Sequence, residues 1–305
     1  MQIVITGANS AVGQAILRCG PKQLGSAATF VGVVRSSHAA EQLRRQVDGA
    51  SRVVQASYDD PGSLDAVFKD ASAIIHLAGI LVEKPGSTYE QANVVSTRSV
   101  AEAAQRSAVQ KLVLISATAA DETSSNRYYR TKGQAEAFVR ASGLPYTVLR
   151  APLLLGPSTA GAAALKRNIR GGKAKLIGGG RNFQQPLYVD DLARAAVAAC
   201  ELSVAKNLTL DVVGPVSLPE RELVERAASL LGRKVQIRSV SKALLSLLLA
   251  ARKFVAKPGF SRDALEVITS DTRLDPQLAA RLLGIELTGI DQMIRNSVEE
   301  GLRNE

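Results

Sequence analysis

Six apolar runs without polar alternation lie in the first 150 residues, and they constrain the fold more than any other feature of this sequence. Such runs, rich in Val, Ile and Leu, are typical of strands buried on both faces, and hence of a parallel sheet covered by helices. The predicted strands are Gln2–Thr6, Thr29–Val34, Arg52–Gln55, Ala73–Leu77, Lys111–Ser116 and Tyr146–Leu149.

The segments between these runs have helical patterns. The predicted helices are Val12–Cys19, His38–Val47, Ser63–Lys69, Tyr89–Ser107 and Asn126–Ala141. Strands that alternate with helices through right-handed crossovers leave a doubly wound α/β fold with a parallel sheet as the main candidate.

The first predicted strand ends in a glycine-containing turn that runs directly into a helix. Gly7 permits the tight turn and Gly13 lets the helix pack closely on the strand, while the helix N-terminus offers N–H groups to a pyrophosphate. Ser10 or Ala11 stands where the pattern has its middle glycine, and both are small enough for phosphates to approach. The strand–turn–helix context predicts a Rossmann fold that binds a dinucleotide through Gly7, Asn9, Ser10, Ala11, Val12 and Gly13.

The pattern of strands and helices changes after residue 150. A stretch rich in Gly, Ala and Pro is followed by a helix after Asp190, a strand near Leu208–Val213 and a helical, basic tail from Glu220. We expect a dinucleotide-binding domain over 1–150 and 184–213. We expect a small, mainly helical C-terminal substrate domain over 151–183 and 214–305.

The end of the second predicted strand indicates which dinucleotide binds. An acid at this place would bind a ribose 2′-hydroxyl, but the chain has Arg35 and Ser36 here and no acid before Glu41. An arginine offers planar, bidentate donors that suit a 2′-phosphate. We therefore expect NADP(H) to be favoured over NAD(H).

Tyr128 and Lys132 stand four residues apart in a predicted helix, so they share one helical face. A free phenol is a poor acid or base at neutral pH, and we expect the neighbouring ammonium to lower the pKa of Tyr128. Lys132 can also hold ribose hydroxyls. Ser116 ends the fifth strand, at the sheet edge where ligands bind in open α/β folds, and we expect it to orient a substrate oxygen.

Together these residues resemble the short-chain dehydrogenase/reductase superfamily in its extended and atypical branches. Further matching segments are Leu77-Ala78-Gly79, the Asn93 to Thr97 helix, Ala151-Pro152 and Gln185 to Ala193. The resemblance implies that Leu77, Ala78 and Gly79 line the adenosine side of the cofactor. It implies that Ala151 and Pro152 lie along the nicotinamide.

Within the superfamily, the sequence is similar to the group that contains the NADPH-binding accessory subunit of respiratory complex I and its free-standing bacterial relatives. The short spacing from Ser116 to Tyr128 and the glycine-rich loop at 178–180 are typical of this group. The third-strand aspartate that contacts adenine in the family corresponds to Ser57 here, followed by Tyr58. The resemblance therefore places Ser57 and Tyr58 at the adenine.

The segment 242–257 is leucine-rich with basic ends. It fits a lid helix over a hydrophobic substrate, a helix on a membrane surface, or a core helix of the small domain. We expect the leucines of Ala243–Ala251 to face an apolar pocket at the nicotinamide. A peripheral contact with a membrane or a protein complex through 242–257 stays open.

Several classes of function are not supported by the sequence. The few aromatic residues disfavour a nucleic-acid partner, and the two cysteines and two histidines have no metal-ligand spacing. A strand that begins at Gln2 leads us to expect a cytoplasmic, at most membrane-peripheral, location.

The function that we expect is NADP(H)-dependent oxidoreduction of a carbonyl or alcohol, with quinone-like or otherwise apolar small molecules as substrates. Tyr128, Lys132 and Ser116 are the expected catalytic residues. Two alternatives stay open, because fold analogy alone does not decide function. One is a non-catalytic NADP(H)-binding or assembly protein of the complex I type, and the other is a nucleotide-sugar epimerase or dehydratase.

Overall fold

A seven-stranded parallel sheet forms the centre of the computed structural model, which describes residues 1–47, 51–77, 79–251 and 261–302. Its strands are β1 (Gln2–Thr6), β2 (Thr29–Val34), β3 (Ser51–Gln55), β4 (Ala73–His76), β5 (Lys111–Ala117), β6 (Tyr146–Ala151) and β11 (Leu208–Asp211). The six strands predicted in the first 150 residues are confirmed, each within two residues at either end.

The strand order across the sheet is β3-β2-β1-β4-β5-β6-β11, and each neighbouring pair is parallel. The chain moves outward from β1 to β3, returns to the other side of β1 at β4 and then moves outward again. This reversal creates a crevice at the carboxyl ends of β1 and β4, which is where open α/β sheets bind ligands. The predicted Rossmann architecture is confirmed.

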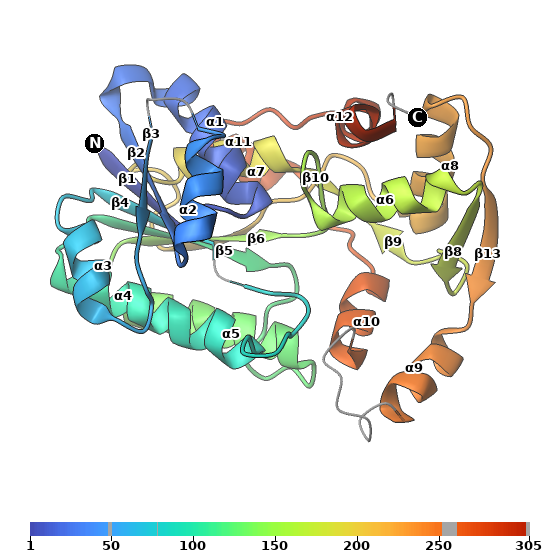
Figure 1. Cartoon of the computed structure of the whole chain (residues 1–305), viewed down its shortest axis with the longest axis horizontal. Coiled ribbons are helices and arrows are strands. Elements are labelled where there is room, and N and C mark those ends of the chain that lie inside the picture. The colour runs from blue at the N-terminus through green and yellow to red at the C-terminus, as the bar shows by residue number, and fades with distance from the viewer. Residues whose placement is uncertain (48–50, 78, 252–260, 303–305) are drawn as a thin grey trace.

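Helices cover both faces of the sheet (Figure 1). They are α1 (Ala11–Leu24), α2 (Ser37–Arg44), α3 (Pro61–Phe68), α4 (Ser96–Arg106), α5 (Arg127–Ala141) and α7 (Val189–Ala198). Buried side chains of α1, α2 and α7 join one hydrophobic cluster, and those of α3, α4 and α5 join a second. The strands between the two clusters are therefore buried on both faces, as their unbroken apolar runs predicted.

The C-terminal part forms a smaller unit beyond the carboxyl end of β6 (Figure 1). Its helices are α6 (Ala160–Arg170), α8 (Glu220–Leu230), α9 (Lys242–Ala251), α10 (Arg262–Thr269), α11 (Gln277–Leu283) and α12 (Ile290–Leu302). The expectation of a mainly helical tail missed the strand β13 (Gln236–Val240), which pairs with β8 (Lys173–Ile177). This strand escaped prediction because it is short and polar, and its partner is about sixty residues away in the sequence.

Several contacts among the described residues join the smaller unit to the rest of the chain, and one of them is between α10 and α5. Three others are short. They are β7 (Leu154–Leu155) with β10 (Leu187–Tyr188), β9 (Phe183–Gln184) with β12 (Leu218–Pro219), and the packing of α11 against α7. One turn of 3₁₀ helix, η1 (Gly25–Ala27), and one π-helical stretch, η2 (Glu90–Val95), complete the described elements. Within the described ranges, no helix has the length and apolar composition needed to cross a membrane.

Candidate functional site

The turn between β1 and α1 has the geometry of a phosphate-binding loop. Gly7 has a φ of +72°, a conformation that L side chains rarely adopt. A Cβ on Gly13 would lie 2.5 Å from the carbonyl oxygen of Ala8, so α1 approaches the turn as closely as only glycine permits. The free N–H groups at the start of α1 therefore point toward the sheet edge, where an anion can bind.

Ser10 has a defined role at the position where the pattern has its middle glycine. Its hydroxyl caps α1 by accepting a hydrogen bond from the Gly13 N–H at 3.1 Å. The N–H groups of Ala11 and Val12, in the first helical turn, have no acceptor within the helix. The loop from Asn9 to Gly13 thus keeps donors for a pyrophosphate, although one donor of the turn is already bonded.

The predicted adenosine residues Arg35 and Tyr58 lie together beyond this loop. The Arg35 guanidinium lies over the Tyr58 ring, 6.0 Å from its centroid. Burial raises the pKa of the Tyr58 phenol, which the Thr6 side chain and the Gly7 backbone contact. Arg35 and Tyr58 therefore border the phosphate loop on the side where the adenosine would lie.

The two predicted serines of this region bond to nearby backbone. The Ser36 hydroxyl caps α2 by accepting from the Ala39 N–H at 3.2 Å, and the Ser57 hydroxyl accepts from the Asp59 N–H at 3.2 Å. Ser36 therefore stands at a helix N-terminus next to Arg35, a position that suits a phosphate. Ser57 stabilises a turn, and the structure gives it no feature specific to adenine.

His76 lies beneath the cofactor loops and ties three elements together. Its Nδ1 lies 2.6 Å from the Thr6 hydroxyl and its Nε2 lies 3.2 Å from the Thr97 hydroxyl. Burial, with a smaller contribution from the Lys132 ammonium, lowers the pKa of His76 to about 3. His76 is therefore a neutral structural residue. Among the described residues, no group of His, Cys, Asp and Glu side chains is arranged to hold a metal ion.

The loop after β4 brings Gly79 to Asn93 and Lys132. Gly79 has a φ of +139°, and a Cβ there would lie 3.1 Å from the Asn93 Oδ1 and 3.4 Å from the Lys132 Nζ. Leu77 lies at the other end of this loop, where its carbonyl oxygen borders Gly7. Ala78, predicted for the same segment, lies outside the described residues. The lack of a side chain at Gly79 thus lets its backbone lie close to the Asn93 and Lys132 side chains.

Asn93 is fully buried within the π-helical stretch η2. Its amide nitrogen donates to the Thr131 hydroxyl at 2.9 Å, and its oxygen accepts from the Ile80 N–H at 3.3 Å. Single π-helical turns occur frequently at functional sites. Here the turn fixes a polar side chain between the β4 loop and α5.

Lys132 is buried at the centre of the site, where its Nζ donates to the Ile115 carbonyl oxygen at 2.9 Å. Burial lowers the pKa of Lys132 to about 8, and the Glu136 carboxylate opposes this shift. An ammonium held here supplies donors that fit the ribose hydroxyls of a bound dinucleotide. The glycine turn, Asn93 and Lys132 together fit such a cofactor.

Tyr128 lies one turn before Lys132, in the helix that Asn126 caps. The Asn126 side-chain oxygen accepts from the Tyr128 N–H at 3.0 Å. The Tyr128 ring packs against Tyr89 and Tyr129, with centroids 5.9 and 5.6 Å apart. Burial and the two neighbouring phenols raise the pKa of Tyr128, so the expected lowering by Lys132 is wrong for this structure. Tyr128 is therefore a neutral phenol that can donate a proton.

Ser116 does not reach the substrate side as we expected. Its hydroxyl donates to the Glu136 carboxylate at 2.6 Å inside the protein. Thr118, two residues further along, lines the same pocket as Tyr128 instead. The sequence signal that could have found it is that Thr118 is the first hydroxyl beyond the end of β5.

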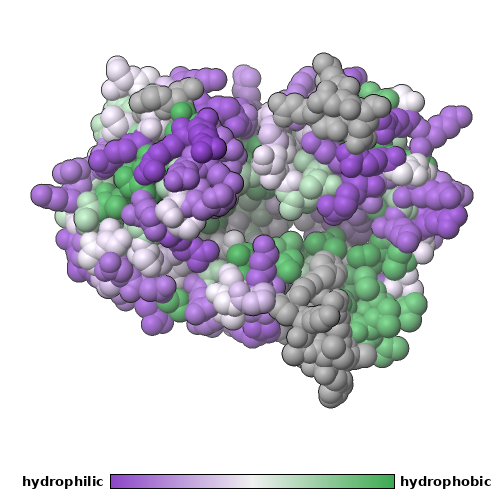
Figure 2. Space-filling model, viewed as in Figure 1, coloured by the Kyte–Doolittle hydropathy of each residue, from purple (hydrophilic) through white to green (hydrophobic). Residues whose placement is uncertain are grey.

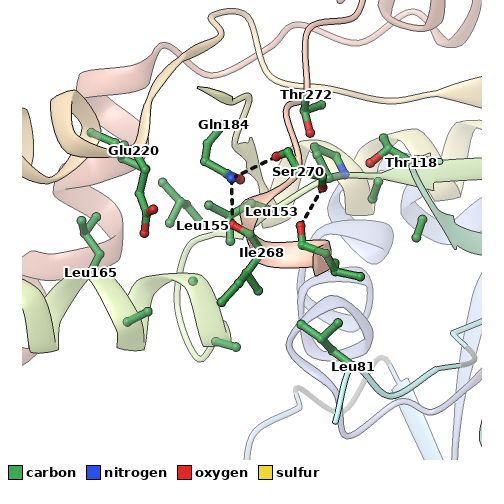
Figure 3. A pocket seen from close by; sticks show the side chains of 18 of the residues that line it. Leu81, Thr118, Leu153, Leu155, Leu165, Gln184, Glu220, Ile268, Ser270 and Thr272 are labelled. Carbon is green, nitrogen blue, oxygen red and sulfur yellow. Dashed lines mark hydrogen bonds between the residues drawn. The ribbon is translucent and has the colours of Figure 1, made fainter. Parts of the chain in front are cut away.

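An apolar pocket of about 300 Å³ extends from Tyr128 into the C-terminal unit (Figure 3). The predicted nicotinamide residues Ala151 and Pro152 line it, next to Thr118 and Tyr128. Its apolar walls are Leu81, Leu153, Leu155, Leu165, Leu223, Val224, Val267 and Ile268. The pocket therefore places Tyr128 at a cavity whose walls suit an apolar ligand.

The leucines of α9 do not form a wall of this pocket. Leu244, Leu247 and Leu248 are each more than half exposed. The expectation that Ala243–Ala251 faces the pocket is therefore wrong. Helices α6, α8 and α10 supply the apolar walls in its place.

The fold and the site together define a dinucleotide-binding protein of the extended short-chain dehydrogenase/reductase type. Residues 7–201 match the sequence model of a family described as NAD(P)H-binding, and the chain belongs to that family. The cofactor class is therefore NAD(P)H.

Two relatives of known name are similar in sequence. A ceramide reductase of Caulobacter vibrioides is 27% identical over 185 residues, which cover 61% of this chain and 58% of that protein. The mitochondrial NADH dehydrogenase (ubiquinone) 1 alpha subcomplex subunit 9 of Arabidopsis thaliana is 25% identical over 235 residues, or 72% of this chain and 58% of that protein. The chain thus matches less than two thirds of either relative. The predicted resemblance to complex I accessory subunits is confirmed.

Solved structures share the fold over nearly the whole chain. The triphenylmethane reductase of Citrobacter sp., complexed with NADP(H), has a TM-score of 0.76 at 20% identity and covers 97% of this chain and 100% of its own. The UDP-glucose 4-epimerase of Thermotoga maritima, with UDP-glucose, has a TM-score of 0.76 at 19% identity. The match covers 100% of this chain and 99% of the epimerase chain. At these identities the likeness establishes the fold.

The pKa of Lys132 predicts that NADPH binds more weakly at alkaline pH. The ammonium is lost as pH rises through about 8, and with it a charged donor. We expect the affinity to fall by roughly tenfold between about pH 7 and 9.5, a change typical of one charged hydrogen bond. Fluorescence titration of NADPH across this range measures the change.

The variant Lys132→Met provides the control for this prediction. It should bind NADPH weakly, with no dependence on pH in the same range. His76 is already neutral here and Glu136 is paired with Arg150, so neither residue accounts for the change. An unaltered pH profile in Lys132→Met would contradict the role of Lys132.

Proposed function

We propose that this chain is an NADP(H)-dependent reductase that acts on the carbonyl group of an apolar small molecule. The observation that carries the proposal is the position of Tyr128, whose side chain lines the apolar pocket one helical turn from the buried Lys132. A proton donor thus lies where the cofactor loops meet a site for an apolar ligand. The reductase likeness in sequence supports the same reaction class.

The side chains have complementary roles in this reaction. The Tyr128 hydroxyl donates a proton to the carbonyl oxygen, and Thr118 orients that oxygen by a hydrogen bond. Lys132 and Asn93 hold the cofactor ribose and the loop beside it. NADPH, when bound, supplies the hydride that the carbonyl carbon accepts.

The pocket favours this substrate class over a nucleotide sugar. None of the pocket-lining side chains in the described part of the chain is a lysine or an arginine. A nucleotide sugar carries a diphosphate, which proteins commonly bind through such cations or through helix N-termini. The leucine-rich walls instead bury an apolar molecule.

We propose NADP(H) over NAD(H) because of Arg35, which lies with Ser36 and the N-terminus of α2 at the adenosine end. Calorimetry should show tighter binding of NADPH than of NADH. Arg35→Ala should reduce the difference by roughly 1–3 kcal/mol, the range for hydrogen bonds to charged groups. The control is Arg106→Ala, which changes an exposed arginine on α4. It should leave the difference between NADPH and NADH affinity unchanged. Equal affinities in the unmodified protein would contradict the preference.

Catalysis by Tyr128 is tested with NADPH oxidation against a series of ketones, aldehydes and quinones. Tyr128→Phe should lower turnover by about 10²–10⁴-fold, because the general acid is lost. NADPH affinity should barely change, because the hydroxyl acts on the substrate. The control is Tyr146→Phe, at the amino end of β6, whereas the site lies at the carboxyl ends of the strands. This variant should keep the turnover of the unmodified protein.

A different outcome would favour a binding protein over an enzyme. If the protein binds NADPH but oxidises it with none of these compounds, the non-catalytic role replaces our proposal. The similarity to a complex I subunit is the observation that would then apply. Full activity of Tyr128→Phe would leave the reductase in place and remove Tyr128 from its mechanism.

A further inference from the structure

The pocket contains one charged side chain among its described lining residues, that of Glu220. Figure 3 shows Glu220 and Thr118 on opposite sides of the pocket, with Leu153, Leu155 and Ile268 between them. The pocket is therefore polar at both ends and apolar between them. Its reactive end lies with Thr118, next to Tyr128.

Glu220 is held firmly in this position. It is the first residue of α8, and its N–H donates to the Asn182 carbonyl oxygen at 2.9 Å. Burial raises the pKa of its carboxyl group, and a hydrogen bond from the Asn182 side chain opposes that shift in part. Leu165 and Leu223 line the pocket with it. A carboxyl group in such surroundings is stabilised by each further donor that it can accept.

Gln184, a further polar side chain of the pocket, is already bonded. The Gln184 side-chain nitrogen donates to the carbonyl oxygens of Ile268 and Ser270 at 3.2 and 3.5 Å, as Figure 3 shows. These bonds fix the pocket wall. Glu220 keeps acceptor capacity, because a carboxyl group has two oxygens with several lone pairs.

We infer that Glu220 binds a hydroxyl, amide or ammonium group at the end of the substrate remote from its carbonyl. This inference rests on the proposed reductase function and names its substrate class. The substrate is an amphiphile, with a carbonyl at Tyr128, an apolar stretch along the leucines and a hydrogen-bond donor at Glu220. A hydrophobic molecule without that donor would desolvate the carboxyl group further and leave it with the Asn182 hydrogen bond but no new donor, which is costly.

Unreactive ligands test this inference without any turnover. In the presence of NADPH, calorimetry compares 1-decanol and 1-decylamine with decyl methyl ether, which lacks a donor. The unmodified protein should bind the alcohol and the amine about tenfold more tightly than the ether, the size of a hydrogen bond to a charged group.

Substitutions of Glu220 separate the outcomes. Glu220→Gln should still bind the alcohol more tightly than the ether, but it should no longer prefer the amine to the ether. Glu220→Leu should lose both preferences and still bind the ether. Glu222→Gln, on the exposed side of α8, is the matched control and should behave like the unmodified protein. A preference that survives in Glu220→Leu, or ligands that do not bind the unmodified protein, would overturn the inference. Absence of ketone reduction would overturn only the proposed function.

A second, independent observation concerns the surface of α9. Leu244, Leu247 and Leu248 are 56%, 67% and 58% exposed, and their spacing places them on one helical face. Figure 2 shows hydrophobic surface gathered over α9 at the lower right of the molecule. An exposed apolar face of this kind is typical of an interaction site.

The charge around α9 indicates what binds there. Among the described residues of 227–262 there is no Asp or Glu, and the basic residues are Arg233, Lys234, Arg238, Lys242 and Arg262. On the adjoining β8–β13 pair, Lys175 is aligned with Arg238, and both are exposed. Leucines beside a cluster of cations complement the acyl chains and head groups of an anionic bilayer.

We propose that α9 docks on the surface of an anionic lipid bilayer. The helix is ten residues long, far too short to cross a membrane, so it lies in the interface. It packs against α10, whose Val267 and Ile268 line the pocket. Docking would bring the pocket wall close to the lipid phase, from which an amphiphile can enter.

Vesicle co-sedimentation of the full chain tests this proposal. We expect binding to vesicles of phosphatidylcholine with phosphatidylglycerol, and little binding to phosphatidylcholine alone. Replacing Leu244, Leu247 and Leu248 together by Ser should weaken binding by about tenfold or more, since three exposed apolar side chains are lost. The matched control replaces two exposed leucines of α11, Leu278 and Leu282, by Ser and should bind normally.

Other results would overturn this proposal. Equal binding to both kinds of vesicle, or no binding to either, would exclude anionic lipid as the occupant. A change of oligomeric state in the α9 variant, without vesicle binding by the unmodified protein, would assign the face to a second copy of the chain.

Discussion

The geometry of the site depends on the buried carboxylate of Glu136. It accepts hydrogen bonds from the Ser116 hydroxyl and from two nitrogens of Arg150, which joins α5 to β5 and β6. Loss of Arg150 would leave this buried carboxylate with the longer ion pair to Arg140, at 3.2 Å, and such a loss is destabilising because a buried charge is costly unless it is well paired. The same carboxylate favours the charged form of Lys132 one turn earlier on α5. One buried residue therefore holds in place the helix that carries Tyr128 and Lys132 and favours the charged form of Lys132.

The opposite end of α5 connects the site to the C-terminal unit. The Asn126 side chain donates to the Asp263 carbonyl oxygen and to the Glu266 carboxylate, and the Arg127 N–H donates to the Asp263 carboxylate. All of these acceptors belong to α10, which also supplies a wall of the pocket. Tyr128 is thus held between a helix packed on the sheet and a helix of the smaller unit. The proton donor and the apolar binding surface are positioned by the same contacts.

The sequence predicted the sheet, the phosphate turn and the pair of Tyr128 and Lys132, because each depends on local pattern or on a fixed helical spacing. It did not predict Thr118 in place of Ser116, since the direction of Ser116 is decided by Glu136, twenty residues away. The pocket walls escaped prediction for a similar reason. They come from α6, α8 and α10, whose meeting is a tertiary event that no single segment encodes. The outward face of α9 is likewise decided by packing.

The apolar character of the pocket also bears on the protonation of the site residues. Burial raises the pKa of Tyr128, so the phenol is a weaker acid than a free phenol and keeps its proton at neutral pH. Reduction of a carbonyl needs a proton donor, whereas oxidation of an alcohol needs an acceptor. The lowered pKa of Lys132 has the same cause, because burial disfavours both charged forms. In the reduction that we propose, Tyr128 is therefore in the protonated form that a carbonyl oxygen needs once negative charge develops on it.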